Sequence, residues 1–221
     1  MAVDYHMHTD HTDGTATVRQ MAEAAAGNGI DEILFTEHVR HSSTYYPSFV
    51  DEVRGIQDLN LTVRVGIETK AIDLEGRLDC SPQIASICDG IVASVHRPPE
   101  NVNGADPSWS KLEPDAALEL EFKLAMAIVT NSRAHILGHP MGMVVTRFKL
   151  RPIEQLYELA EACRAHDKAF ELNTRYCANP DDWIEIVRRA GCKVSFGSDA
   201  HKVSDVGSAW QIFMRQGTEE I

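Results

Sequence analysis

The sequence DYHMHTDHTDG, residues 4–14, brings three histidines and three aspartates together close to the start of the chain. His6 and His8 stand at positions i and i+2, so a strand would present both imidazoles on one face while Met7 packs outward. Imidazole nitrogens and carboxylate oxygens are donors that bind zinc and other transition metals in proteins. The stretch therefore predicts a strand that ends in a metal site, to which the following loop adds Asp13.

Short apolar, β-branched runs alternate with amphipathic segments along the rest of the chain, a pattern typical of repeated β/α units. Seven strands are expected, over residues 3–8, 32–38, 62–69, 90–96, 134–139, 169–174 and 193–198. Helices are expected over residues 17–28, 114–131, 152–166 and 180–190, and the last three open with a proline close to the first turn. No shift in composition divides the chain, so residues 1–221 are interpreted as a single domain.

Polar residues collect at the expected ends of these strands and in the loops that follow them. The candidate metal ligands are His6, His8, Asp13, His38, Glu68, His96, His139, Asp199 and His201. In a β/α barrel the carboxyl ends of all strands face one mouth, so this placement favours an α/β barrel over an open doubly wound sheet. A site with one ion uses about three or four protein ligands. The nine candidates therefore predict two or three ions, and we favour three.

The composition limits the partners of this protein. Lys and Arg total 21 against 33 Asp and Glu, and the formal charge of −12 disfavours binding to long nucleic acids. A small anionic substrate stays compatible with this charge, because carboxylates around bound cations do not act as free negative charge. No run reaches the roughly 18 apolar residues of a membrane span. Five cysteines without a CxxC pair indicate reduced thiols, so a cytoplasmic protein without membrane contact is expected.

Five further motifs follow the opening one in order: TEH at residues 36–38, GIE at 66–68, SVH at 94–96, GHP at 138–140 and GSDAH at 197–201. With these motifs the chain resembles the PHP (polymerase and histidinol phosphatase) domain family from about residue 3 to about residue 202. The resemblance implies a distorted, seven-stranded TIM-like β/α barrel with a trinuclear metal centre that hydrolyses phosphoesters. The opening motif departs from the family pattern in having Thr12 where serine is usual, and in having His11, which could compete with Asp13.

The resemblance also implies a division of the ligands among three divalent ions, for which zinc, manganese and iron are all suitable. His6, His8, Glu68 and Asp199 would hold the first ion, Glu68, His96 and His139 the second, and Asp13, His38 and His201 the third. Glu68 and Asp199 are expected to be catalytic through the ions that they hold. His11 or His41 is a candidate proton donor to the leaving group.

Residues next to the motif ends are candidates for substrate binding. Arg97 and Arg175 are expected to contact a phosphate group, and Lys70 and Arg147 are further candidates. The loop over residues 97–113 is too long for a simple connection and is expected to lie over the site.

Three functions fit these observations. The first is hydrolysis of a small phosphomonoester by a metal-activated hydroxide, with histidinol phosphate as the leading substrate. The second is a phosphoesterase or exonuclease that acts on nucleotides or short oligonucleotides. The third is a non-catalytic PHP module with a structural or regulatory metal site, but such modules tend to lose ligands and all nine positions here carry competent ones. The sequence leaves the oligomeric state open.

Overall fold

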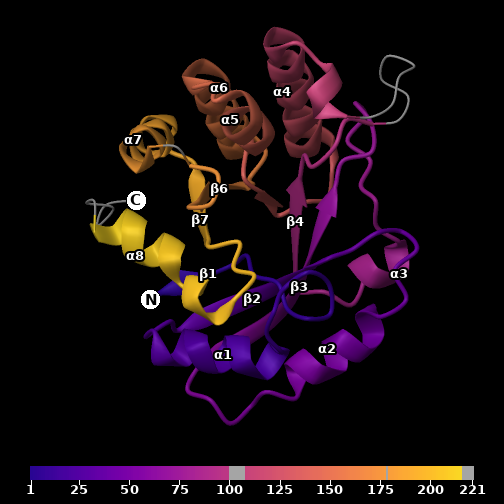
Figure 1. The fold of residues 1–221 in the computed structure, drawn as a ribbon, viewed down its shortest axis with the longest axis vertical. Coiled ribbons are helices and arrows are strands. Elements are labelled where there is room, and N and C mark those ends of the chain that lie inside the picture. Colours follow the sequence, from indigo (N-terminus) through magenta and orange to yellow (C-terminus); the bar gives the residue numbers. More distant parts are fainter. Residues whose placement is uncertain (100–107, 178, 216–221) are drawn as a thin grey trace.

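The computed structural model describes residues 1–99, 108–177 and 179–215. Within them, seven parallel strands form one sheet in chain order (Figure 1). The strands are β1 (Val3–Asp4), β2 (Glu32–His38), β3 (Thr62–Lys70), β4 (Gly90–Ser94), β5 (Ile136–Leu137), β6 (Ala169–Asn173) and β7 (Lys193–Gly197). All seven predicted strands are confirmed, although β1 and β5 are only two residues long, shorter than expected.

The first and last strands meet, and this contact closes the sheet into a barrel. The backbone N–H of Tyr5 donates to the Phe196 carbonyl of β7 at 2.8 Å. Further along, the N–H of His8 donates to the Ala200 carbonyl at 2.8 Å, and Met7 forms a parallel bridge with Ala200. The predicted seven-stranded barrel is therefore confirmed, and the alternative of an open doubly wound sheet is wrong.

Helices surround the strands, with α1 and α2 below them and α4 to α7 above them in Figure 1. The helices are α1 (Val18–Gly27), α2 (Tyr46–Arg54), α3 (Pro82–Ala85), α4 (Pro114–Asn131), α5 (Gly142–Phe148), α6 (Ile153–Ala165), α7 (Pro180–Ala190) and α8 (Ser208–Arg215), with short 3₁₀ turns η1 (Trp109–Lys111) and η2 (Val203–Asp205). The four predicted helices correspond to α1, α4, α6 and α7 and are confirmed to within one residue at each end. In the described ranges, no helix is long and apolar enough to cross a membrane.

The ends of two predicted helices show why the sequence folds this way locally. At the start of α1 the Thr17 side chain accepts from the Gln20 backbone N–H, and the Gln20 side chain accepts from the Thr17 backbone N–H. This reciprocal pair satisfies two donors that the first turn of a helix leaves free. At the end of α7, Gly191 adopts the left-handed conformation with φ of 63°, which a glycine takes without a steric penalty.

The mouth of the barrel is the end at which its strands terminate. Apolar side chains fill the part of the barrel away from this mouth. Leu34, Val92 and Ile136 form a small buried cluster there. Gly66 and Gly90 leave room for it, because a Cβ at either position would lie 2.8 Å from a Leu34 side-chain carbon. Since side chains alternate along a strand, polar residues further along β2, β3 and β4 also face inward. They are Thr36 and His38 on β2, Glu68 on β3 and Ser94 on β4. The inward-facing polar residues thus lie closer to the mouth.

Candidate metal centre

The ends of the strands bring all nine predicted ligands into one cluster. Three groups have donor atoms within 4.8 Å of one another: His6, His8 and Glu68; His38, Glu68 and His96; and His8, Asp13, His38 and His201. The two remaining candidates join these groups. His139 Nε2 lies 3.2 Å from His96 Nε2, and Asp199 Oδ1 lies 3.2 Å from His8 Nε2.

Glu68 lies at the centre of the cluster, and only 1% of its side chain is exposed. Its Oε2 lies 2.9 Å from His38 Nδ1 and 3.4 Å from His6 Nε2. Its Oε1 lies 3.0 Å from His139 Nε2 and 3.1 Å from His96 Nε2. The two oxygens therefore face separate sets of imidazoles, an arrangement in which one carboxylate can serve two neighbouring ions.

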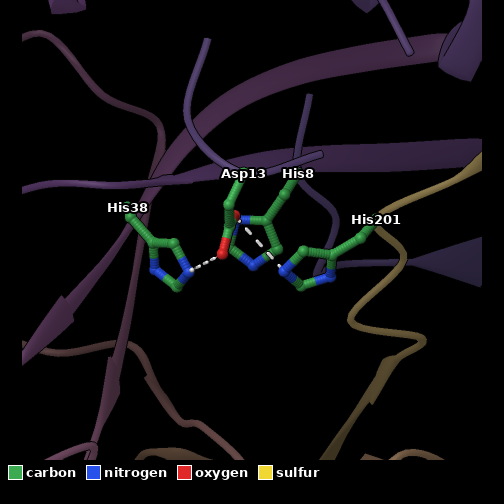
Figure 2. A group of neighbouring side chains, drawn as sticks. All are labelled: His8, Asp13, His38 and His201. Carbon is green, nitrogen blue, oxygen red and sulfur yellow. Dashed lines mark ion pairs between the residues drawn. The ribbon is translucent and has the colours of Figure 1, made fainter. Parts of the chain in front are cut away.

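A second carboxylate, Asp13, lies between His38 and His201 (Figure 2), and its side chain is 55% exposed. Its Oδ2 is 3.3 Å from His38 Nε2, and its Oδ1 is 3.3 Å from His201 Nε2. The His8 ring lies close to both histidines, with centroid distances of 4.3 Å to His38 and 4.5 Å to His201. This loop aspartate therefore completes a group whose histidines come from the ends of β1 and β2 and from the segment after β7.

Unpaired buried nitrogens provide a test of whether these residues fit a metal. Among the described residues, His6 Nε2, both ring nitrogens of His8 and His139 Nδ1 are buried and make no hydrogen bond of good geometry. Leaving buried polar atoms without partners is costly, and each such atom in a native protein needs an explanation. Metal ligation explains His6 Nε2 and His8 Nε2, which converge on the carboxylates of Glu68 and Asp199, so the donor set fits a metal centre.

Burial and neighbouring charges hold three of the candidate donors in the forms that bind metal. Burial lowers the pKa of His8 to about 4, so its imidazole is neutral near neutral pH. Burial disfavours the charge of Glu68, but His96 and His6 outweigh that effect and hold the pKa of its carboxyl well below the usual range. The pKa of Asp199 is lowered in the same way, because His6 and His8 offset its burial. Neutral imidazoles and ionised carboxylates are the species that ligate divalent ions, so His8, Glu68 and Asp199 are already in that form. Neighbouring carboxylates outweigh burial and raise the pKa of other histidines, which would release a proton when an ion binds; these are His6, His38, His139 and His201.

The backbone is strained at two of the candidate ligands. His139, after β5, has a φ of 26°, and Asp199, after β7, has a φ of 51°. Residues other than glycine rarely adopt this left-handed region, and such conformations persist where the surrounding structure enforces them, commonly at functional sites. The turn at His139 also explains why β5 ends before the predicted residue 139, since the chain leaves the extended conformation as His139 turns into the cluster.

The sequence analysis missed a buried carboxylate that supports the ligands. Glu171, on β6, is fully buried, and its Oε1 lies 2.6 Å from His6 Nδ1. Its Oε2 accepts a hydrogen bond of 2.5 Å from the backbone N–H of His139 and one of 3.1 Å from Asn173 Nδ2. Carboxylates in this position fix the orientation and tautomer of a ligating histidine. The signal in the sequence was a charged residue within the apolar strand AFELN, residues 169–173.

Two motif glycines make room for residues that hold the ligands in place. A Cβ at Gly138 would overlap Ser94 Oγ, which donates a hydrogen bond of 2.6 Å to Glu68 Oε1. A Cβ at Gly197 would overlap Glu171 Oε1. The glycines of GHP and GSDAH are thus explained by the close approach of neighbouring strands.

The overlap at position 197 leads to a stability prediction. We expect Gly197→Ala to displace Glu171, to lower the free energy of unfolding by about 1–3 kcal/mol and to reduce metal content. Thermal unfolding and metal analysis would measure both effects. Gly27→Ala is the matched control, because a Cβ at that helical position has no atom within 4 Å. If Gly197→Ala matched Gly27→Ala in both measurements, the account of this close approach would be wrong.

His11 lies apart from the three donor groups. Its Nε2 is 2.7 Å from Glu52 Oε2 of α2, and its ring packs against Phe49 with centroids 5.2 Å apart. It therefore pairs with Glu52 rather than joining His38 and His201, which face Asp13 in the structure. Its role as a proton donor stays a prediction.

A cavity of about 290 Å³ opens over the cluster, and Arg97 and Arg175 both line it, as do candidate ligands. Arg175 Nη1 lies 2.8 Å from His201 Nδ1 and 3.6 Å from Asp199 Oδ2. Lys70 also lines the cavity, whereas Arg147 belongs to α5 and is not among the lining residues that the structure describes. Of the predicted covering loop 97–113, residues 100–107 lie outside the described residues.

Comparisons with known proteins agree with this fold. A 25% identical histidinol-phosphatase from Lactococcus lactis subsp. lactis matches 90% of this chain and 84% of its own length. The DNA polymerase/3'-5' exonuclease PolX of Bacillus subtilis is 26% identical over 90% of this chain, which spans only 34% of that protein. A crystal structure of histidinol phosphate phosphatase from Lactococcus lactis, complexed with zinc, L-histidinol and phosphate, has a TM-score of 0.72 at 21% identity and covers 98% of this chain and 94% of its own.

Family models match nearly the whole chain. A PHP-associated model matches residues 184–221, and the PHP domain model matches residues 4–175. The match to the PHP domain model covers well over half of the sequence and includes all of the candidate ligands except Asp199 and His201. The chain therefore belongs to the PHP domain family.

Proposed function

We propose that this chain is a metal-dependent phosphoesterase that hydrolyses small phosphomonoesters. The observation that carries the proposal is the position of Glu68, whose two oxygens face separate sets of histidines in a cavity that Arg97 and Arg175 also line. A cluster that binds ions beside cationic side chains suits a phosphoryl group, which needs its charge neutralised as it reacts.

The proposed centre holds three ions. His6, His8, Glu68 and Asp199 would bind the first, Glu68, His96 and His139 the second, and Asp13, His38 and His201 the third. Three overlapping donor groups, linked by Glu68, His8 and His38, support this number. Zinc, manganese or iron suits the histidine-rich donor set. Such ions lower the pKa of bound water and neutralise phosphoryl oxygens.

The residues of the chain orient the reacting groups. Ser94 donates to Glu68, and Glu171 accepts from His139, so the ligands keep their directions when substrate binds. Arg175 is placed beside Asp199 and His201, where its guanidinium can donate to a phosphoryl oxygen. Arg97 lies in the cavity wall directly after the ligand His96 and is the second proposed phosphate contact.

Among the three functions considered, a phosphatase for small molecules has the best support. The cavity volume of about 290 Å³ and the formal charge of −12 suit a small phosphoester better than a long strand. Retention of all nine donors favours catalysis over a purely structural metal site. Histidinol phosphate is the substrate that the named relative suggests, and the assay includes it for that reason.

The test is phosphate release by protein of known metal content. We expect release from an aryl phosphate under at least one of manganese, zinc or iron, its loss after chelation, and its recovery when that metal is returned. L-histidinol phosphate and nucleoside monophosphates, assayed in parallel, would identify the preferred leaving group. A fully metallated sample that releases no phosphate from any substrate would refute the proposal.

A further inference from the structure

The cavity wall carries a second group of cations, on the side formed by β2, β3 and β4. Arg40, Lys70 and Arg97 line the cavity there and follow the candidate ligands at the ends of those strands. Lys70 is two residues beyond Glu68 on β3, so both side chains face into the barrel. The strand rise places Lys70 about 7 Å nearer the solvent than Glu68. The cations therefore lie above the metal cluster.

A carboxylate outside the metal cluster holds two of these cations together. Lys70 Nζ lies 3.6 Å and Arg40 Nη1 lies 4.0 Å from the same oxygen, Asp79 Oδ2. Asp79 is itself fixed, because its other oxygen accepts a hydrogen bond of 2.9 Å from the His41 backbone N–H, and its own N–H donates to the Lys70 carbonyl at 2.9 Å. One carboxylate shared by two cations leaves a net positive charge at this place.

The charge of the cavity contrasts with that of the chain. The chain carries a formal charge of −12, yet four cationic side chains among the described residues line this cavity. The described carboxylates that line it, Asp13, Glu68 and Asp199, are all proposed metal ligands, so divalent ions would offset them. Arg175, beside Asp199, serves the phosphoryl group on the β6 and β7 side. Arg97 is the other proposed phosphate contact, so Arg40 and Lys70 are left to face the remainder of the substrate.

Building on the proposed function, we infer that the preferred substrate is a small phosphomonoester whose leaving group carries a second anionic group, bound by Arg40 and Lys70. A phosphate and a carboxylate share the required chemistry, since both accept charge-assisted hydrogen bonds from guanidinium and ammonium groups. The same cations repel an ammonium group. Histidinol phosphate, whose leaving group carries one, is therefore a poorer substrate than an anionic analogue.

Matched pairs of substrates test this inference with the metal-loaded protein. One pair is 3-phosphoglycerate and glycerol 3-phosphate, which differ in a carboxylate, and the other is fructose 1,6-bisphosphate and fructose 6-phosphate, which differ in a phosphate. We expect kcat/KM to favour the more anionic member of at least one pair by about 10-fold or more. The pair that shows the preference distinguishes a carboxylate from a phosphate.

Variants of the two cations link the preference to this side of the cavity. Lys70→Gln and, separately, Arg40→Gln should lower the ratio of kcat/KM values within the preferred pair by about 10-fold. Lys193→Gln is the control, because Lys193 is an exposed lysine at the opposite end of the barrel, where β7 begins. It should leave the ratio unchanged.

The outcomes separate this inference from the proposed function. Release of phosphate from an aryl phosphate, with ratios near one in both pairs, would overturn the inference and leave the function standing. A ratio that both cation variants leave unchanged would do the same. No release from any substrate by the metal-loaded protein would overturn the function and the inference together.

Discussion

Replacing Glu68 with alanine should abolish phosphate release while the barrel stays folded. Glu68 faces His38 and His6 with one oxygen and His96 and His139 with the other, so its loss removes a ligand from two of the proposed ions at once. We expect the rate to fall by about 10³-fold or more, because the charge that offsets the phosphoryl group is lost with the ions. Phosphate release and the number of ions bound per chain would be measured together.

Two controls separate loss of the site from loss of the fold. Glu119→Ala removes an exposed carboxylate of α4, which pairs with Lys123, and should keep full activity. Glu68→Gln keeps the shape of the side chain and should lose activity as Glu68→Ala does, because an amide is neutral and binds divalent ions less well. Circular dichroism should show the same barrel in all three variants. Undiminished turnover in either Glu68 variant would show that this carboxylate is not needed.

Elements with a strong local signal could be predicted from the sequence, and elements without one could not. The range of β2 and those of α4 and α7 were predicted to the residue, because each combines a clear apolar period with proline or with an abrupt end. In contrast, α5 follows a turn in which Met141 adopts a φ of 59°, and its first turn is capped from another helix: the Glu121 carboxylate of α4 accepts from the backbone N–H groups of Met143 and Val144 at 2.9 and 2.7 Å. A helix whose start depends on contacts with distant parts of the chain leaves no local sequence signal at that end.

The candidate ligands were predictable because each lies at or just beyond the end of a strand, or in the loop that follows one, so the barrel brings them together. Glu171 was missed because its role depends on two partners from other strands, His6 and His139, and on the space that Gly197 leaves. The environment of His11 depends on Glu52 of α2, a helix that the sequence analysis did not predict. Long-range partners therefore explain both the missed residue and the unexpected placement.

Replacing Asp4 with alanine should cause a large loss of stability. Asp4 is fully buried in β1, where its Oδ1 accepts from the Ser198 backbone N–H at 3.0 Å. Its Oδ2 accepts from Ser198 Oγ at 2.5 Å and from the Gly207 backbone N–H at 2.8 Å. Alanine would remove the acceptor of both backbone N–H groups and would leave the Ser198 hydroxyl with the His6 carbonyl at 3.3 Å, so we expect the free energy of unfolding to fall by about 3–5 kcal/mol.

The Asp4 change should also affect the proposed metal centre, because Ser198 immediately precedes the candidate ligand Asp199 on the segment that Asp4 holds against β1. Urea unfolding should be measured at pH 8, above the pKa of about 6 to which burial raises the Asp4 carboxyl, and with chelator present so that bound ions do not contribute. Asp4→Asn keeps one acceptor oxygen and should lose less stability. Asp58→Ala removes only an exposed partner of Arg19 and should cost about 1 kcal/mol or less. If Asp4→Ala and Asp58→Ala unfolded at the same urea concentration, this prediction would be wrong. Asp4 would then not hold the segment after β7 to β1.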